Sequence, residues 1–283
     1  MQFSHDAMCP EISPVDCADP NVNIIHHEHH QSVLLTRLQP SLSVGMGRGW
    51  QAMLRTPFDI KKMGIEYTDT AGNPYKPPYG NIHHRNEVLL GPGDSEFELQ
   101  RYWATGQGWI VGGGIGSMIP IGRTEEDPYI RASQSLTHQH MQMGGGTFDP
   151  IMSATAVWGG HQWGMSMQGK GRIGLYENKK NYKSSSFAQI GAGPTYRFTS
   201  KLMFTSDVTA QHDWQAQWAG EPDPMSGRTI LMVGTSLIHR FNPYVAMMGQ
   251  TRITIFQVST ENQILQRFVG SLGISVTPRG NTE

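Results

Sequence analysis

The stretch YVAMMGQTRITIF at residues 244–256 alternates between apolar and polar side chains. Its polar face carries Gln250, Arg252 and Thr254, and its other face is mostly apolar. A period of two indicates a β-strand, because successive side chains point to opposite sides of the backbone. The stretch is longer than the usual globular strand of about 5–6 residues. It therefore predicts a strand that crosses a membrane and turns its polar face toward a lumen.

The same alternation recurs along the whole chain. It is clear in FVGSLGISVT at 268–277 and in FAQIGAGPTYRF at 187–198, where Gln189 and Arg197 lie on the polar face. Sustained helical periodicity is missing, so we predict an all-β protein. Further alternating runs occur near 32–47, 49–67, 95–104, 107–121, 148–158, 161–175, 200–213 and 228–240.

The connections between these runs alternate in length. Short links and long polar links on opposite rims are typical of outer-membrane barrels. We therefore predict a transmembrane antiparallel up-and-down β-barrel of about 12 strands, with ten as the alternative. It forms one domain over 23–283, and a soluble sandwich or propeller is the competing fold. The short links lie near 105–106, 159–160, 199–201 and 241–243, and the long ones at 68–94, 122–147, 176–185 and 214–227.

Composition agrees with a barrel in the bacterial outer membrane. Of 283 residues, 16% are charged, and the formal net charge is −1. A nucleic-acid-binding protein is usually strongly basic, so that class is excluded. A lipid-facing barrel surface needs little charge. The N-terminus has no charged region followed by an apolar core, so we take the chain as a mature or trimmed form.

Residues 1–22 are predicted to be an irregular N-terminal segment, because Pro10, Pro14 and Pro20 interrupt regular structure. Cys9 and Cys17 are the two cysteines of the chain. We predict that they form a small disulfide loop in an oxidising compartment, with two free thiols as the alternative.

Histidine and methionine are abundant, with 12 and 16 residues, and they cluster in two tracts. Imidazole and thioether donors favour copper, and imidazole with carboxylate also suits zinc. The metal hypothesis competes with a solvated segment before the first strand and with an ordinary loop. The first tract contains His26, His27, Glu28, His29 and His30, and the second contains His138, His140, Met141 and Met143.

Three motifs in the middle of the chain carry a family resemblance. They are Gly91, Gly93 and Asp94, then Pro120 and Gly122, and finally Gly146, Thr147, Asp149 and Pro150. In this order they resemble the transporter-like outer-membrane barrel family named for the MetA pathway of phenol degradation. The resemblance spans residues 91–158 and implies a barrel that passes small molecules, with aromatic compounds as the usual candidates.

We expect no enzyme, because the chain lacks the nucleophile-elbow, zinc-protease, P-loop and dinucleotide-binding motifs. The function hypothesis is an outer-membrane channel or transporter for a small solute, either aromatic or metal-linked. The alternative is a structural barrel that binds copper or zinc within a larger outer-membrane assembly. The expected partners are lipid and the solute, and the expected pore-lining residues are Gln189, Arg197, Gln250, Arg252 and Thr254.

Overall fold

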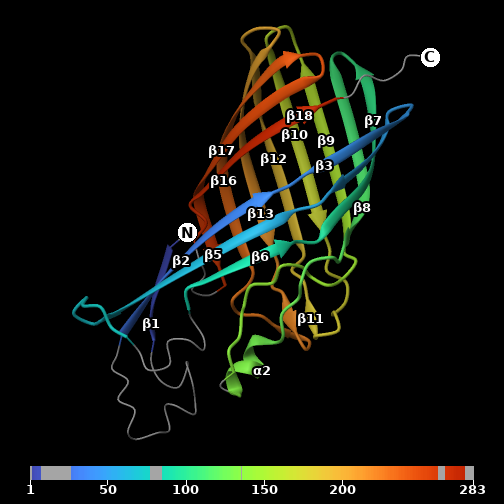
Figure 1. Ribbon diagram of the computed structural model, residues 1–283. Helices are drawn as coiled ribbons and strands as arrows, with labels where there is room; N and C mark the ends of the chain where they lie inside the picture. The colour runs from blue at the N-terminus through green and yellow to red at the C-terminus, as the bar shows by residue number, and fades with distance from the viewer. Residues whose placement is uncertain (1, 8–26, 77–84, 135, 261–264, 278–283) are drawn as a thin grey trace, which may run out of the picture.

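The computed structural model describes residues 2–7, 27–76, 85–134, 136–260 and 265–277. Nearly all of its regular structure is β-strand (Figure 1). The one helix of these residues, α2, spans Pro128–Ser133. The strands are β1 (Gln2–Ala7), β2 (His27–Leu38), β3 (Ser41–Gly47), β4 (Trp50–Arg55), β5 (Phe58–Asp69), β6 (Glu87–Pro92), β7 (Ser95–Gly106), β8 (Trp109–Ile119), β9 (Pro150–Gly159), β10 (Trp163–Arg172), β11 (Tyr182–Lys183), β12 (Phe187–Arg197), β13 (Leu202–Asp213), β14 (Gln217–Trp218), β15 (Glu221–Pro222), β16 (Arg228–Asn242), β17 (Val245–Ser259) and β18 (Phe268–Val276).

The main sheet has eleven strands in the order β18-β17-β16-β13-β12-β10-β9-β8-β7-β4-β3. Every neighbouring pair is antiparallel, and most are consecutive along the chain. This is the up-and-down order that the alternating runs predicted. Within the described ranges, no strand pairing joins β18 to β3 or to β1.

Three long strands are bent where they leave the main sheet. β2 continues into β3 past Pro40, β4 into β5 past Pro57, and β6 into β7 past Gly93. Proline has no N–H for the ladder, so Pro40 and Pro57 break regular pairing at the first two bends, and Pro92 ends β6 at the third. The lower halves, β2, β5 and β6, form a separate sheet with β1. With each bent strand counted once, β1 is the twelfth strand, close to the predicted number.

The outward face of the main sheet is apolar. Ile190 is 63% exposed, Ile253 is 57% exposed and Leu272 is 74% exposed. A soluble surface rarely shows so many large apolar side chains together, whereas a barrel surface in lipid requires them. No helix in the described part of the chain is long and apolar enough to cross a membrane.

The two ends of the sheet differ (Figure 1). Tight hairpins close one end, for example at Gly47–Trp50, where Arg48 has a φ of 52°. The other end carries long loops that contain α2 and the small sheet of β11, β14 and β15. This division agrees with the alternating link lengths in the sequence.

Several details differ from the sequence-based predictions, among them the small sheet of β11, β14 and β15 in two of the predicted links. The N-terminal segment is not irregular throughout, because Gln2–Ala7 pair with β2. The link over 68–94 contains β6, and the link over 122–147 contains α2. β1 and β6 are stabilised by pairing with β2 and β5, which are partners that their own periodicity does not reveal. Helix α2 is capped locally by Asp127, but its 6 residues are too few to show a helical period. Cys9, Cys17 and the proposed disulfide lie outside the described residues.

Candidate functional site

A cavity of about 670 Å³ lies on the inner face of the main sheet. Arg55 on β4 and Arg252 on β17 both line it, although these strands are near opposite edges of the sheet. The sheet is therefore curled so that its two ends face one lumen. The lining consists of Arg55, Glu98, Gln100, Tyr102, Ile110, Gly112, Gly113, Ser153, Ala154, Thr155, Val157, Gln168, Gly169, Lys170, Gln189, Met248, Gln250 and Arg252.

One wall of this cavity holds a four-charge cluster. Arg55 and Lys170 each contact the carboxylates of both Glu96 and Glu98. The Arg55 Nη1 lies 3.0 Å from Glu98 Oε1, and Lys170 Nζ lies 2.5 Å from Glu96 Oε2. Glu98 is only 1% exposed and also accepts a hydrogen bond of 2.6 Å from the Ser153 hydroxyl. Such a buried carboxylate is tolerated because every charge has a partner.

The facing wall carries a second ion pair. Arg252 Nε lies 3.2 Å from Asp207 Oδ1, which also accepts a 2.7 Å hydrogen bond from Thr209 Oγ1. Gln250 donates to Ser236 Oγ at 3.1 Å. The lumen is therefore polar and cross-linked from strand to strand, as a water-filled barrel interior requires.

The structure places the predicted lining residues in two groups. Gln189, Gln250 and Arg252 line the cavity. Thr254 lies opposite Met232 and is half-buried, and Arg197 is exposed at the end of β12, where it donates to the His161 carbonyl at 3.4 Å. Neither belongs to this cavity lining.

Sequence reasoning missed the charged cluster. Glu96 and Glu98 lie on β7, and Lys170 lies on β10. The alternation of polar and apolar side chains along each strand indicates only that these three residues face the lumen. Their contacts join β7 to β10 across two intervening strands. One indication of this cluster is present in the sequence, because Glu96, Glu98 and Lys170 are charged residues on polar strand faces in a chain with only 16% charged residues.

The three family-like motifs meet at the loop end of the barrel. The Asp94 carboxylate accepts hydrogen bonds from Gly122 N at 2.9 Å and from Gly145 N at 2.6 Å. Asp149 accepts from the hydroxyls of Thr147, at 2.7 Å, and Ser184. These bonds fasten the loop between β8 and β9 to the rim. The motifs are thus one anchoring unit assembled from three places in the sequence.

The glycines at 144–146 fit against this anchor. A Cβ at Gly144 would collide with the Asp94 carboxylate, and Gly146 adopts a φ of 73°, which favours glycine. Gly145 lies against Ser184 and Asp94, and Gly146 lies against Thr124 and Asn178.

The long loops interlock into a cap at this end. The Tyr129 hydroxyl donates to Asp223 Oδ1 at 2.6 Å, and the Asn178 amide donates to the Gly145 carbonyl at 2.9 Å. Lys180 Nζ lies 3.0 Å from Glu126 Oε1. Each bond joins two different long loops, so the cap is one connected body.

The histidine and methionine tract lies inside this cap. The rings of His138 and His140 are 5.3 Å apart, and Tyr129 lies edge-on to His140 at 5.7 Å. Burial lowers the pKa of His140 to about 4 and also lowers the pKa of His138. Met143 is buried, and Met141 is half-buried. Burial therefore favours the neutral form of both imidazoles.

The first histidine tract enters β2. His27 is fully buried and packs against the rings of Tyr67 and Tyr75, at 6.1 and 4.9 Å. His30 Nε2 lies 3.5 Å from Glu28 Oε2. His26 and the side chain of His29 fall outside the described residues. Among the residues that are described, no three or more His, Cys, Asp or Glu side chains form a group that could hold a metal.

No protein-family model matches the chain, and no curated protein matches it. Several solved structures have a similar fold. An outer membrane channel from Pseudomonas putida F1 has a TM-score of 0.57 at 9% identity, over 89% of this chain and 86% of that one. The NanC porin has a TM-score of 0.47 at 9% identity over 98% of both chains. OmpT of Vibrio cholerae has a TM-score of 0.40 at 9% identity, over 87% of this chain and 96% of that one.

The fold is that of an outer-membrane β-barrel. The fold class predicted from the sequence is confirmed by the antiparallel sheet and by its likeness to the Pseudomonas channel. The predicted outer-membrane location agrees with this fold and with the apolar outer face. The narrower resemblance to the phenol-degradation family stays a prediction.

Proposed function

We propose that the chain is an outer-membrane channel that lets small polar solutes cross the barrel, and that it prefers anions. The observation that carries this proposal is the cavity of about 670 Å³, which is lined by polar side chains inside an apolar outer surface. A polar lumen is what a water-filled path through a barrel requires. The absence of the common catalytic motifs from the sequence supports transport over catalysis.

The preference for anions follows from the charges that reach the cavity. Three cations, Arg55, Lys170 and Arg252, line it beside one anion, Glu98. Their other carboxylate partners, Glu96 and Asp207, do not line the cavity. Charged side chains on a pore wall set the sign of the ions that pass most readily.

The chemical identity of the solute remains part of this proposal. The family resemblance implies an aromatic compound, and Tyr102 contributes an aromatic ring to the lining. A metal-linked solute and a metal-binding structural barrel are the other predictions from the sequence. They have no supporting cluster in the described part of the chain.

Single-channel recording tests the proposal. The purified protein in a planar bilayer should give discrete conductance steps, and a salt gradient should give a reversal potential that indicates anion preference. Gln168 lies in the cavity lining and is exposed to it. Gln168→Glu should reduce or reverse the preference, because it adds a negative charge to the wall.

The matched control is Gln162→Glu, which places the same charge in a short turn outside the cavity. It should leave the reversal potential close to that of the unmodified protein. A folded, inserted protein without conductance would contradict the channel proposal. Conductance without anion preference would contradict only the selectivity.

A further inference from the structure

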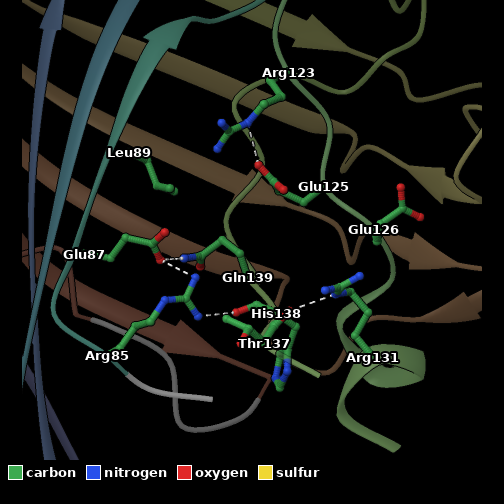
Figure 2. Close-up of a pocket in the computed structure, with 10 residues that line it drawn as sticks. All are labelled: Arg85, Glu87, Leu89, Arg123, Glu125, Glu126, Arg131, Thr137, His138 and Gln139. Atoms are coloured by element: carbon green, nitrogen blue, oxygen red, sulfur yellow. Dashed lines mark hydrogen bonds and ion pairs between the residues drawn. The ribbon is translucent and has the colours of Figure 1, made fainter. Parts of the chain in front are cut away.

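A second cavity, of about 250 Å³, lies in the cap at the loop end (Figure 2). It is set between β6 and the loop that connects β8 to β9. Its charged lining consists of three arginines, Arg85, Arg123 and Arg131, and three glutamates, Glu87, Glu125 and Glu126. The cavity is too small for a macromolecular segment and large enough for a small organic ion, since a water molecule occupies about 30 Å³ in the liquid.

Most of these charges are already paired. Arg85 lies 2.7 Å from Glu87, and Arg123 lies 2.7 Å from Glu125. Glu126 pairs at 3.0 Å with Lys180, which reaches it from the neighbouring loop. Of the three arginines in the lining, only Arg131 takes part in none of these ion pairs.

Arg131 has a different set of contacts. Its Nε donates to the Thr137 carbonyl at 2.8 Å, and it forms no ion pair within the ranges that the structure describes. Asp127, one helical turn earlier, uses its carboxylate to cap α2 through the backbone N–H groups of Tyr129 and Ile130. Figure 2 shows Arg131 on one side of the pocket, with the Arg123–Glu125 and Arg85–Glu87 pairs on the others. The three arginines of the lining and Lys180 carry four positive charges, and the three glutamates carry three negative charges. The pocket therefore has one positive charge in excess.

Building on the proposed channel function, we propose that this cap pocket binds a small monocarboxylate and holds it before it enters the lumen. The carboxylate pairs with the Arg131 guanidinium, whose fork of N–H donors matches two carboxylate oxygens. Arg123, with 61% of its side chain exposed, offers a second guanidinium on the facing side. Leu89, which is 4% exposed, contributes an apolar wall for a short hydrocarbon body.

The charge balance selects this ligand class. A monocarboxylate neutralises the single excess charge, whereas inorganic phosphate brings a larger negative charge close to three glutamates. A simple cation would face the positive charge of Arg131, which has no ion pair among the described residues. The cationic side chains of the lumen lining, Arg55, Lys170 and Arg252, then give the same anion a favourable route onward.

Calorimetric titration of the detergent-solubilised full chain with sodium butyrate tests the proposal. Butyrate should bind measurably, and butyramide, its uncharged analogue, should bind at least about tenfold more weakly, because the charge-assisted pair is lost. Arg131→Gln should weaken butyrate binding by about tenfold or more, and Arg131→Lys should retain part of it. Inorganic phosphate should bind more weakly than butyrate.

The matched control is Lys179→Gln, which removes the same charge from an exposed position in the cap outside this pocket. It should leave butyrate binding unchanged. Equal butyrate affinity in the unmodified protein and in Arg131→Gln, or equal affinity for butyrate and butyramide, would overturn the proposal. So would a lack of butyrate binding in a protein that conducts. A protein that binds butyrate without conducting would refute the channel function while leaving the binding site in place.

Discussion

At the residue scale, Asp94 decides how the longest described loop is held. Its two carboxylate oxygens accept hydrogen bonds from backbone N–H groups at both ends of that loop, those of Gly122 and Gly145. Hydrogen bonds to a charged acceptor contribute about 1.5–3 kcal/mol each. The close approach needs glycine at 122 and 144, where a Cβ would meet the opposite backbone or the carboxylate. A loop of this length therefore depends on a few atoms at its base.

We expect Gly144→Ala to destabilise the protein by about 1–3 kcal/mol, because the added methyl forces the anchor apart. Urea titration of the folded protein measures this change. Gly249→Ala is the control, since no atom lies within 4 Å of the added Cβ, and it should change the stability by less than about 0.5 kcal/mol. Equal stability of Gly144→Ala and the unmodified protein would refute the role given to this contact.

At the element scale, the cap is held by bonds between loops. Helix α2 has only 6 residues, so it is unstable on its own and relies on its Asp127 cap and on Tyr129, which bonds to Asp223. His140 packs against the Tyr129 ring of this helix, and His138 packs against His140. His138 faces Arg85 and Arg131, and His140 faces His138, so protonation would add positive charge beside positive charge.

This arrangement predicts that acid loosens the cap. Burial lowers both histidine pKa values, so an open loop takes up protons near the ordinary value of about 6.5, before the closed cap does. The stability of the cap is complete above about pH 6.5 and falls as the pH drops toward about 4, the pKa of His140. Limited proteolysis of loop 122–147 should be faster at pH 5 than at pH 7.5.

His140→Phe should weaken this pH dependence, because the buried titrating ring is removed while an aromatic ring remains. His161→Gln, in an exposed short turn, should preserve it. If cleavage of the unmodified protein proceeds at the same rate at both pH values, histidine burial does not control the cap. The same conclusion follows if His140→Phe and the unmodified protein respond alike.

At the scale of the whole molecule, one sheet separates two solvents. Met167 on β10 faces outward and is 40% exposed, whereas Gln168, the next residue, lines the cavity. The outer face meets hydrocarbon and the inner face meets polar groups and water. The side of the sheet on which a residue lies therefore controls its tolerance for charge.

We expect Met167→Arg to destabilise the folded barrel in lipid by about 2–4 kcal/mol, because it places a charge near the middle of the apolar surface. Gln168→Arg is the control on the opposite face and should be close to neutral. Denaturant titration of the protein folded into phospholipid vesicles compares the two. Similar losses in both variants would contradict the assignment of the two faces.

The amino-acid sequence by itself determined most of the long strands, the alternation of faces and the short and long connections, but not β1 or β6. These properties are local, since side-chain direction follows from the backbone period and a turn needs only a few residues. For the same reason, Gln189, Gln250 and Arg252 were predicted on the polar face, and they line the cavity.

Only the tertiary structure decided what those faces bring together. Glu98 meets Lys170 across two strands, Asp94 meets Gly145, and Arg131 shares a pocket with Glu87. Each contact joins residues far apart in the chain, and its formation depends on sheet curvature and loop packing. No local pattern encodes such distances, because they result from closing many strands around one interior at once.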